Sequence, residues 1–95
     1  MIMNSKDISI DVFQILHERG IVYKINDLSY FDGQNDIYFI EINKDFIIKL
    51  FQNIQYINGQ YIYDYYTLYF LNSDKDIING YENIIEFIKY YKFKS

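Results

Sequence analysis

Few residues in this chain have side chains of the kind that enzymes use for catalysis. His17 is the only histidine, there is no cysteine, and the serines lie outside any nucleophile-elbow pattern. A catalytic histidine needs a nucleophile or an orienting acid, whereas His17 beside Glu18 fits a helix end, where a basic side chain complements the helix dipole. The glycines are isolated and form no phosphate-binding loop. We therefore predict that the protein is not an enzyme and has no cofactor.

Two groups of acidic residues in polar segments could offer oxygen ligands to a hard cation. They are Asp32, Asn35 and Asp36 around Gly33, and Asp74 with Asp76. Neither group matches the EF-hand pattern, which needs ligands at alternating positions and a closing glutamate. We predict no metal site, and we interpret these aspartates as solvated turn residues that could also form the rim of a binding surface.

Asp64 is the most informative acidic residue, because it lies inside a tyrosine-rich segment. Twelve of the 95 residues are tyrosine, and Tyr63, Tyr65 and Tyr66 surround this aspartate. A carboxylate within a sheet is costly unless it is exposed or hydrogen-bonded. One interpretation is therefore a solvent-facing Asp64, or an Asp64 that accepts a tyrosine hydroxyl. The other is an acidic contact point, framed by tyrosines, for a lysine or arginine of a partner.

A helix near the N-terminus is the first element that positions these residues. Apolar side chains at helical spacing predict it over residues 5–19. Ser5 can cap its start, Asp7 lies in its first turn, and Gly20 suits the left-handed position at its end. Its buried stripe is formed by Ile8, Val12, Ile15, Leu16 and the stem of Arg19.

A second helix is predicted at the other end of the chain, over residues 81–93. Asn79 and Glu82 resemble a capping box at its start, and lysines near its end complement the dipole. Tyr90 and Phe93 point away from its apolar stripe, so a loop or a partner must cover them. The stripe itself is formed by Tyr81, Ile84, Ile85, Ile88 and Tyr91.

The segments between the helices predict a sheet. Residues 43–57 fit either a helix capped by Asn43 or a long strand. Asn58-Gly59 is a strong hairpin signal and favours the strand, with a bulge near Gln52-Asn53. Further strands are expected at residues 21–25, 28–31, 36–42 and 60–71, with a turn at residues 32–35 and a polar loop at residues 72–80.

The hairpin signal also predicts a register for the central strands. It pairs Tyr56 with Tyr61, Ile54 with Tyr63, Leu50 with Thr67, Ile48 with Tyr69, and Phe46 with Leu71. The expected fold is a single α+β domain over residues 1–95. It is a small antiparallel β-meander of four to five strands with an N-terminal and a C-terminal α-helix packed on it.

Charge and composition limit the class of partner. The formal net charge is −4 and Arg19 is the only arginine, so direct binding of nucleic acid is not expected. An acidic surface suits a basic protein instead. The absence of cysteine fits a reducing compartment, residues 1–5 lack the features of a signal peptide, and no apolar run approaches the ~20 residues that span a membrane. We therefore predict a cytoplasmic protein without a membrane segment.

The abundance of isoleucine, tyrosine, asparagine and lysine, with no alanine or proline, indicates AT-rich codons and a low-GC bacterium, its phage or a plasmid. Part of the tyrosine excess then reflects codon composition. Within that setting the sequence predicts a small acidic protein that inhibits a bacterial nucleic-acid-handling protein. It would place carboxylates where phosphates lie and tyrosines where bases stack. Phage and plasmid anti-CRISPR proteins are often built this way, which is an analogy of type without a shared motif.

The predicted partner is a basic protein, namely a nuclease, a CRISPR effector or a toxin. The predicted contact residues are Tyr63, Asp64, Tyr65 and Tyr66, with Asp32, Asp36, Asp74 and Asp76 as an acidic rim. Two other classes stay open at the level of sequence. One is an immunity or antitoxin protein that neutralises a basic toxin by the same physics. The other is a structural protein that forms a homodimer or larger homo-oligomer through an exposed strand edge.

Overall fold

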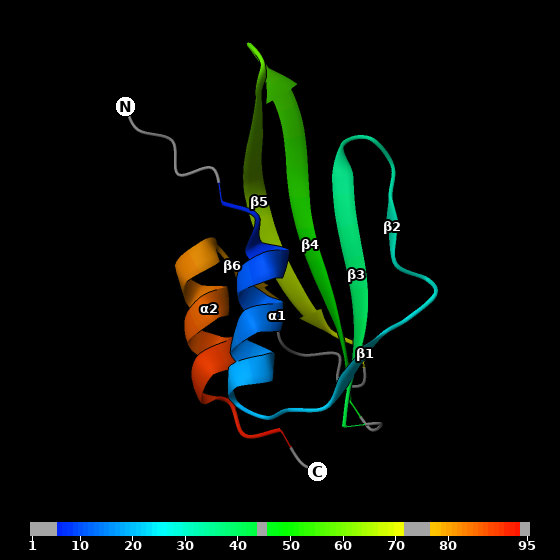
Figure 1. Cartoon of the computed structure of the whole chain (residues 1–95), viewed down its shortest axis with the longest axis vertical. Helices are drawn as coiled ribbons and strands as arrows, with labels where there is room; N and C mark the ends of the chain where they lie inside the picture. The colour runs from blue at the N-terminus through cyan, green and yellow to red at the C-terminus, as the bar shows by residue number, and fades with distance from the viewer. Residues whose placement is uncertain (1–5, 44–45, 72–76, 94–95) are drawn as a thin grey trace.

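Figure 1 shows the computed structural model of the chain, which describes residues 6–43, 46–71 and 77–93. Helices α1 (Ile8–Glu18) and α2 (Tyr81–Tyr90) lie side by side on one face of an antiparallel sheet. The sheet runs in the order β1-β3-β4-β5-β6, with β2 beside β3. Its strands are β1 (Tyr23–Ile25), β2 (Tyr30–Phe31), β3 (Asn35–Ile42), β4 (Phe46–Ile57), β5 (Gln60–Phe70) and β6 (Ile77–Asn79). The predicted α+β fold with terminal helices is confirmed.

Strand β6 is the element that the sequence does not predict. It lies in the segment expected to be a polar loop, and it pairs with Thr67–Tyr69 of β5. A strand of only three residues has too little alternation to be recognised in a sequence. Its pairing with β5 is a tertiary interaction, which no local pattern encodes.

The ambiguous segment before Asn58 is a strand from Phe46 to Ile57, as the hairpin signal favours, and residues 44–45 lie outside the described residues. Asn58 and Gly59 have φ angles of 51° and 80°, the left-handed values that a type I′ turn requires. Near the turn the predicted pairs Tyr56–Tyr61 and Ile54–Tyr63 are present.

Farther from the turn the predicted register is wrong by one residue. The ladder shifts between Phe51 and Asn53, where Gln52 faces both Tyr65 and Tyr66. A bulge at this level was expected, but the extra residue belongs to β5 and not to β4. Leu50 therefore pairs with Leu68, Ile48 pairs with Phe70, and the Leu71 amide donates to the Ile47 carbonyl, in place of the predicted pairs Leu50–Thr67, Ile48–Tyr69 and Phe46–Leu71.

Helix α1 begins later than expected, because Asp7 is its N-cap and not a first-turn residue. The Asp7 carboxylate accepts the amide of Ser9 at 3.0 Å. Ser5, the predicted cap, lies outside the described residues. Gly20 has a φ of 69° and follows the end of the helix, as predicted.

Helix α2 is shorter than predicted and has a different cap. It starts after Gly80, without a side-chain cap, and ends at Tyr90. The capping box is absent because Asn79 belongs to β6, where its side chain accepts the Thr67 hydroxyl at 3.1 Å. Since the chain leaves the helix at Tyr91, Phe93 folds back against the Phe46 ring, 5.6 Å away between centroids.

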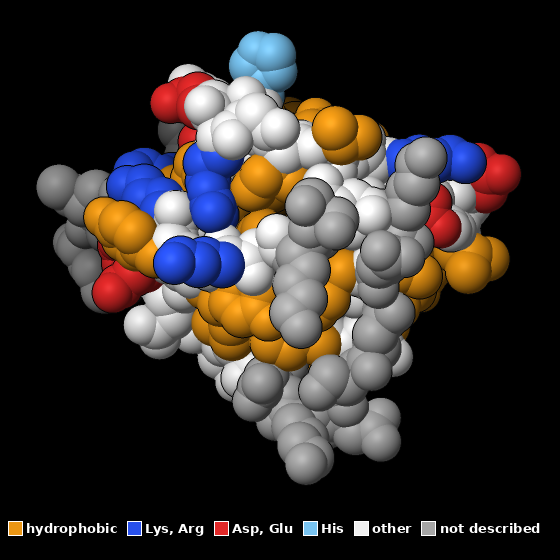
Figure 2. Space-filling view, turned by 90° about the horizontal axis from the view of Figure 1, so that it is seen from below, with side chains coloured by type: hydrophobic (Ala, Val, Ile, Leu, Met, Phe, Trp, Pro, Cys, Tyr) orange, Lys and Arg blue, Asp and Glu red, His pale blue; other side chains and the backbone are white. Residues whose placement is uncertain are grey.

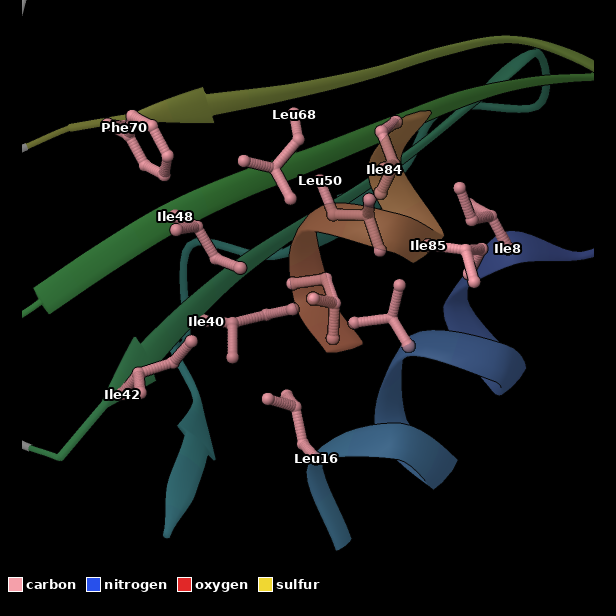
Figure 3. Close-up of a cluster of buried hydrophobic side chains, with 12 residues drawn as sticks. Ile8, Leu16, Ile40, Ile42, Ile48, Leu50, Leu68, Phe70, Ile84 and Ile85 are labelled. Atoms are coloured by element: carbon pink, nitrogen blue, oxygen red, sulfur yellow. The ribbon is translucent and has the colours of Figure 1, made fainter. Parts of the chain in front are cut away.

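The core lies between the two helices and the sheet (Figure 3). Its fully buried side chains include Ile8, Val12, Leu16, Ile40, Ile42, Ile48, Leu68, Ile84 and Ile88. Arg19 ties the ends of the helices together, because its guanidinium donates to the carbonyls of Ile88 at 2.6 Å and Tyr91 at 2.8 Å. This arrangement leaves the other face of the sheet without a helix (Figure 1). Among the described helices, none is long and apolar enough to cross a membrane.

Candidate protein-binding site

The bulge in β5 gives Tyr65 an unusual conformation. Its φ angle is 54°, a left-handed value that costs a residue with a Cβ atom about 1 kcal/mol or more. Glycine is the usual residue at this position of such a bulge. Tyr65 is nevertheless 73% exposed, so packing of its ring does not compensate for the strain. An aromatic ring held out to solvent by strained backbone is typical of a contact residue.

Asp64, the residue before the bulge, has an unsatisfied carboxylate oxygen. Its Oδ1 atom is buried and accepts no hydrogen bond from any part of the chain that the structure describes. Asp64 faces Asn53 across the ladder, but the Asn53 amide donates to the Gln34 carbonyl and to Asn35. A buried acceptor without a donor costs about 1–3 kcal/mol. The Asp64 carboxylate therefore keeps unused hydrogen-bonding capacity, and the next residue in the chain is the exposed Tyr65.

Tyr63 and Tyr66 lie on the opposite face of the sheet from Asp64, toward the helices. The Tyr66 hydroxyl is within hydrogen-bond distance of the carbonyls of Lys6 (2.7 Å) and Tyr63 (2.9 Å), and its ring packs on Tyr81. Burial raises the pKa of both hydroxyls, and the nearby carboxylate of Asp7 adds to the rise. The predicted contact residues are thus divided. Tyr63 and Tyr66 lie toward the helices, Asp64 lies on the other face, and Tyr65 is exposed at the bulge.

The two described residues of the predicted acidic rim, Asp32 and Asp36, accept hydrogen bonds from within the chain. Asp32 closes the turn before β3, where its Oδ1 atom accepts the amides of Gln34 at 3.0 Å and Asn35 at 2.7 Å. These hydrogen bonds lower the pKa of the Asp32 carboxyl. Asp36 points toward α1 and not toward the open face. Asp74 and Asp76 lie outside the described residues.

A polar cluster beneath the start of α1 holds Asp36 in place. Gln52 is only 1% exposed, and its Nε2 atom donates to Asp7 at 2.7 Å and to Asp36 at 2.9 Å. Its Oε1 atom accepts the amide of Ile8 at 3.0 Å. Burial raises the pKa of the Asp36 carboxyl, and the charge of Asp7 raises it further, against the lowering effect of the Gln52 hydrogen bond. The only hint in the sequence was a glutamine at an inward position of an otherwise apolar strand face.

The described residues offer no arrangement for metal binding, since no group of three or more His, Asp or Glu side chains comes together among them. His17 is exposed at the end of α1, and the histidine stands at the surface in Figure 2. Asp11 accepts the Tyr81 hydroxyl, which joins the two helices. The side chains most suited to chemistry thus have structural partners or face solvent.

The chain matches no known protein family, and comparison with curated proteins and with solved structures finds no similar protein. Its function is therefore inferred from its own residues. Among those described, the pair formed by Asp64 and Tyr65, here called the bulge site, combines an unsatisfied acceptor with an exposed aromatic ring.

Proposed function

We propose that this protein is a non-enzymatic inhibitor that binds a basic, nucleic-acid-handling protein of a bacterium through the bulge site, in the manner of an anti-CRISPR protein of a phage or other mobile element. The observation that carries the proposal is the unpaired Oδ1 atom of Asp64, followed in the chain by the exposed ring of Tyr65. Asp64 as a whole is partly exposed, so a lysine or arginine of the partner can bind its carboxylate, and a charge-assisted bond to a carboxylate is about twice as strong as a neutral one.

The exposed ring of Tyr65 offers a cation of the partner an aromatic contact. An ammonium or guanidinium group is attracted to the face of an aromatic ring, and its aliphatic stem packs against the ring edge. A tyrosine side chain has only two torsions, so ordering the exposed Tyr65 ring on binding costs little conformational entropy. The net charge of −4 favours encounter with a basic surface.

Inhibition follows if the basic surface is the one that the partner uses for nucleic acid. Phosphate contacts supply most of the affinity of such proteins for nucleic acid. A bound carboxylate and a stacked tyrosine replace a phosphate and a base at the same groove. The protein then acts as a competitive blocker without chemistry of its own.

The first test is capture of the partner from a lysate of a low-GC bacterium, with and without nuclease treatment, followed by mass spectrometry. The tagged proteins are the wild type and the double variant Asp64→Asn/Tyr65→Ala. A matched control is Asp27→Asn/Tyr30→Ala, which removes an exposed acid and an exposed tyrosine elsewhere on the surface. We expect a nuclease, CRISPR effector or other nucleic-acid-handling protein with the wild type and the control, and its loss with the bulge variant.

Calorimetry with the purified partner then measures how much the bulge site contributes to the affinity. Loss of one charge-assisted contact and one aromatic contact predicts a rise in Kd of about a hundredfold for the bulge variant. The partner's nucleic-acid binding must also fall on stoichiometric addition of the wild type. Equal affinity of the bulge variant and the wild type would rule out the site. Capture that disappears with nuclease treatment would rule out a direct protein partner, and a captured toxin whose nucleic-acid binding is unaffected would favour an immunity protein.

A further inference from the structure

The hairpin tip, defined here as residues 54–63, is an uncharged projection from an acidic molecule. No charged side chain occurs between Lys49 and Asp64, although the chain carries a net charge of −4. In Figure 1 the tip extends past the ends of both helices. Copies of a chain with like net charge repel one another, and this repulsion is weakest where uncharged segments approach. Charge therefore favours the hairpin tip over the rest of the surface for contact between copies.

The β4 side of the tip presents an open strand edge. The last contact of β4 toward β3 is the amide of Ile54, which donates to the Gln34 carbonyl at 2.6 Å. Because backbone groups alternate in direction along a strand, the N–H and C=O of Tyr56 point to the same side as those of Ile54. No strand of the described residues lies there beyond Gln34. A cleft of about 350 Å³ next to this edge is lined by Gly33, Gln34, Asn53, Ile54, Gln55 and Tyr56.

The side chains of the tip are apolar and well exposed. Tyr56 is 66% exposed, Ile57 is 43% exposed and Tyr61 is 61% exposed. The rings of Tyr56 and Tyr61 contact each other across the hairpin, with centroids 4.9 Å apart, which gives the projection a firm aromatic surface. Natural proteins usually protect an exposed strand edge with lysine, proline or a bulge, and this edge has none of them.

We propose that the chain forms a weak symmetric dimer in which the β4 edges of two hairpin tips pair antiparallel, centred on Tyr56. In such a pair the Tyr56 N–H of each copy donates to the Tyr56 C=O of the other, which makes two hydrogen bonds about a two-fold axis. The exposed side chains of one tip have an accessible surface area on the order of 300 Å². Two tips then bury roughly 600 Å², below the ~1,200 Å² of a stable interface, so the dimer is reversible with a Kd of about 10 μM to 1 mM.

The test is sedimentation equilibrium of the wild type and two lysine variants, from about 10 μM to about 1 mM protein, so that the Kd range above is covered. Tyr56→Lys places a charge at the centre of the paired edge. Leu28→Lys is the control, because Leu28 is 67% exposed, lies outside the tip and receives the same change in net charge. We expect a monomer–dimer equilibrium for the wild type and for Leu28→Lys, and a Kd at least about tenfold higher for Tyr56→Lys.

A second measurement uses the wild type alone and does not depend on how well a variant folds. Amide hydrogen exchange is followed by NMR at low and high protein concentration. The Tyr56 amide is expected to exchange at least about tenfold more slowly at the high concentration, because it becomes hydrogen-bonded only in the dimer. The proposal is overturned if the wild type stays monomeric at about 1 mM, if a folded Tyr56→Lys dimerises as well as the control, or if exchange at Tyr56 is independent of concentration.

Discussion

At the scale of single residues, both members of the bulge site lower the stability of the folded protein. Tyr65 stands at a position where glycine is favoured, and the Asp64 carboxylate keeps an unpaired buried oxygen. Each feature lowers the free energy of unfolding by about 1 kcal/mol or more. Residues that reduce stability without a structural benefit are typical of functional sites, where a partner supplies the missing interactions.

Replacing Tyr65 by glycine is expected to relieve the strain. Glycine adopts the left-handed φ of 54° without a steric penalty, and the ring that it removes is 73% exposed. We predict that Tyr65→Gly raises the free energy of unfolding by about 1 kcal/mol in urea denaturation. Thr67→Gly, two residues along the same strand, is the control and should lower it by about 1 kcal/mol. A destabilised Tyr65→Gly would mean that the ring has a packing role.

Asp36 gives the stability of the protein a pH dependence. Its pKa is raised above the ordinary value of 3.8 by burial and by Asp7, so the folded state holds this proton more tightly than the unfolded state does. The contribution of Asp36 to the free energy of unfolding therefore grows as the pH falls through the raised pKa toward 3.8, and it is lost as the pH rises through that range.

Asp36→Asn tests this sign, because asparagine keeps an acceptor for Gln52 and removes the charge that Asp7 repels. We predict that the variant is more stable than the wild type at neutral pH and that the advantage shrinks on acidification toward pH 4. Urea denaturation of both proteins at a series of pH values measures the difference, in which the groups that do not interact with Asp36 cancel. A difference that does not change with pH would contradict the prediction.

At the scale of elements, one side chain joins the C-terminal ends of the two helices, in addition to the core that they share. The Arg19 guanidinium donates to two carbonyls at the C-terminal end of α2, where the helix dipole is negative. Hydrogen bonds from a charged donor contribute about 1.5–3 kcal/mol when partly buried. We predict that Arg19→Ala lowers the free energy of unfolding by about 2 kcal/mol and the Tm by about 10 °C, measured by circular dichroism.

Arg19→Lys separates the charge from the geometry in this prediction. A lysine keeps the favourable charge near the helix end but cannot reach both carbonyls with a planar fork. We expect it to recover less than half of the stability lost in Arg19→Ala. Full recovery would show that the dipole alone accounts for the effect.

The elements that could be predicted from sequence are those whose signals are local. The apolar stripe around Val12 and the Asn58-Gly59 turn each act within a few residues, and both are present in the structure. The bulge at Tyr65 could not be placed on β5, because tyrosine is not the residue that such a bulge favours. Strand β6 and the one-residue register shift depend on pairing between distant segments, which propensity does not report.

Only the local features of the candidate site could be predicted from the sequence. Asp64 stood out as a carboxylate in a tyrosine-rich strand, and this is a feature of composition alone. One Asp64 oxygen stays unpaired while the side-chain amide of Asn53, across the ladder, donates to the Gln34 carbonyl in the turn before β3. Only the folded sheet determines these positions. The extra residue of the bulge brings both Tyr63 and Tyr66 to the helix face, so neighbours in sequence do not form one surface.

At the scale of the whole molecule, the two proposed contacts, one with a basic partner and one between copies of the chain, use surfaces of different charge. In the proposed function the bulge site binds a basic partner through a carboxylate, whereas the hairpin tip is uncharged. Salt screens attraction between opposite charges and also repulsion between copies of an acidic chain, with a Debye length that falls from about 30 Å at 0.01 M to about 3 Å at 1 M. The two interactions should therefore respond to salt in opposite directions.

We predict that raising NaCl from about 0.05 M to about 0.5 M weakens binding of the basic partner by at least about tenfold, because the opposite charges at the bulge site and across the two surfaces are screened. The same change should leave self-association equal or stronger, because the pairing edges carry no charge and repulsion between copies falls. Calorimetry with the partner and sedimentation equilibrium of the protein alone measure the two constants in matched buffers. Partner binding that is indifferent to salt would exclude electrostatic recognition at the bulge site. Self-association that weakens with salt would place the contact between copies at charged residues, and hence away from the hairpin tip.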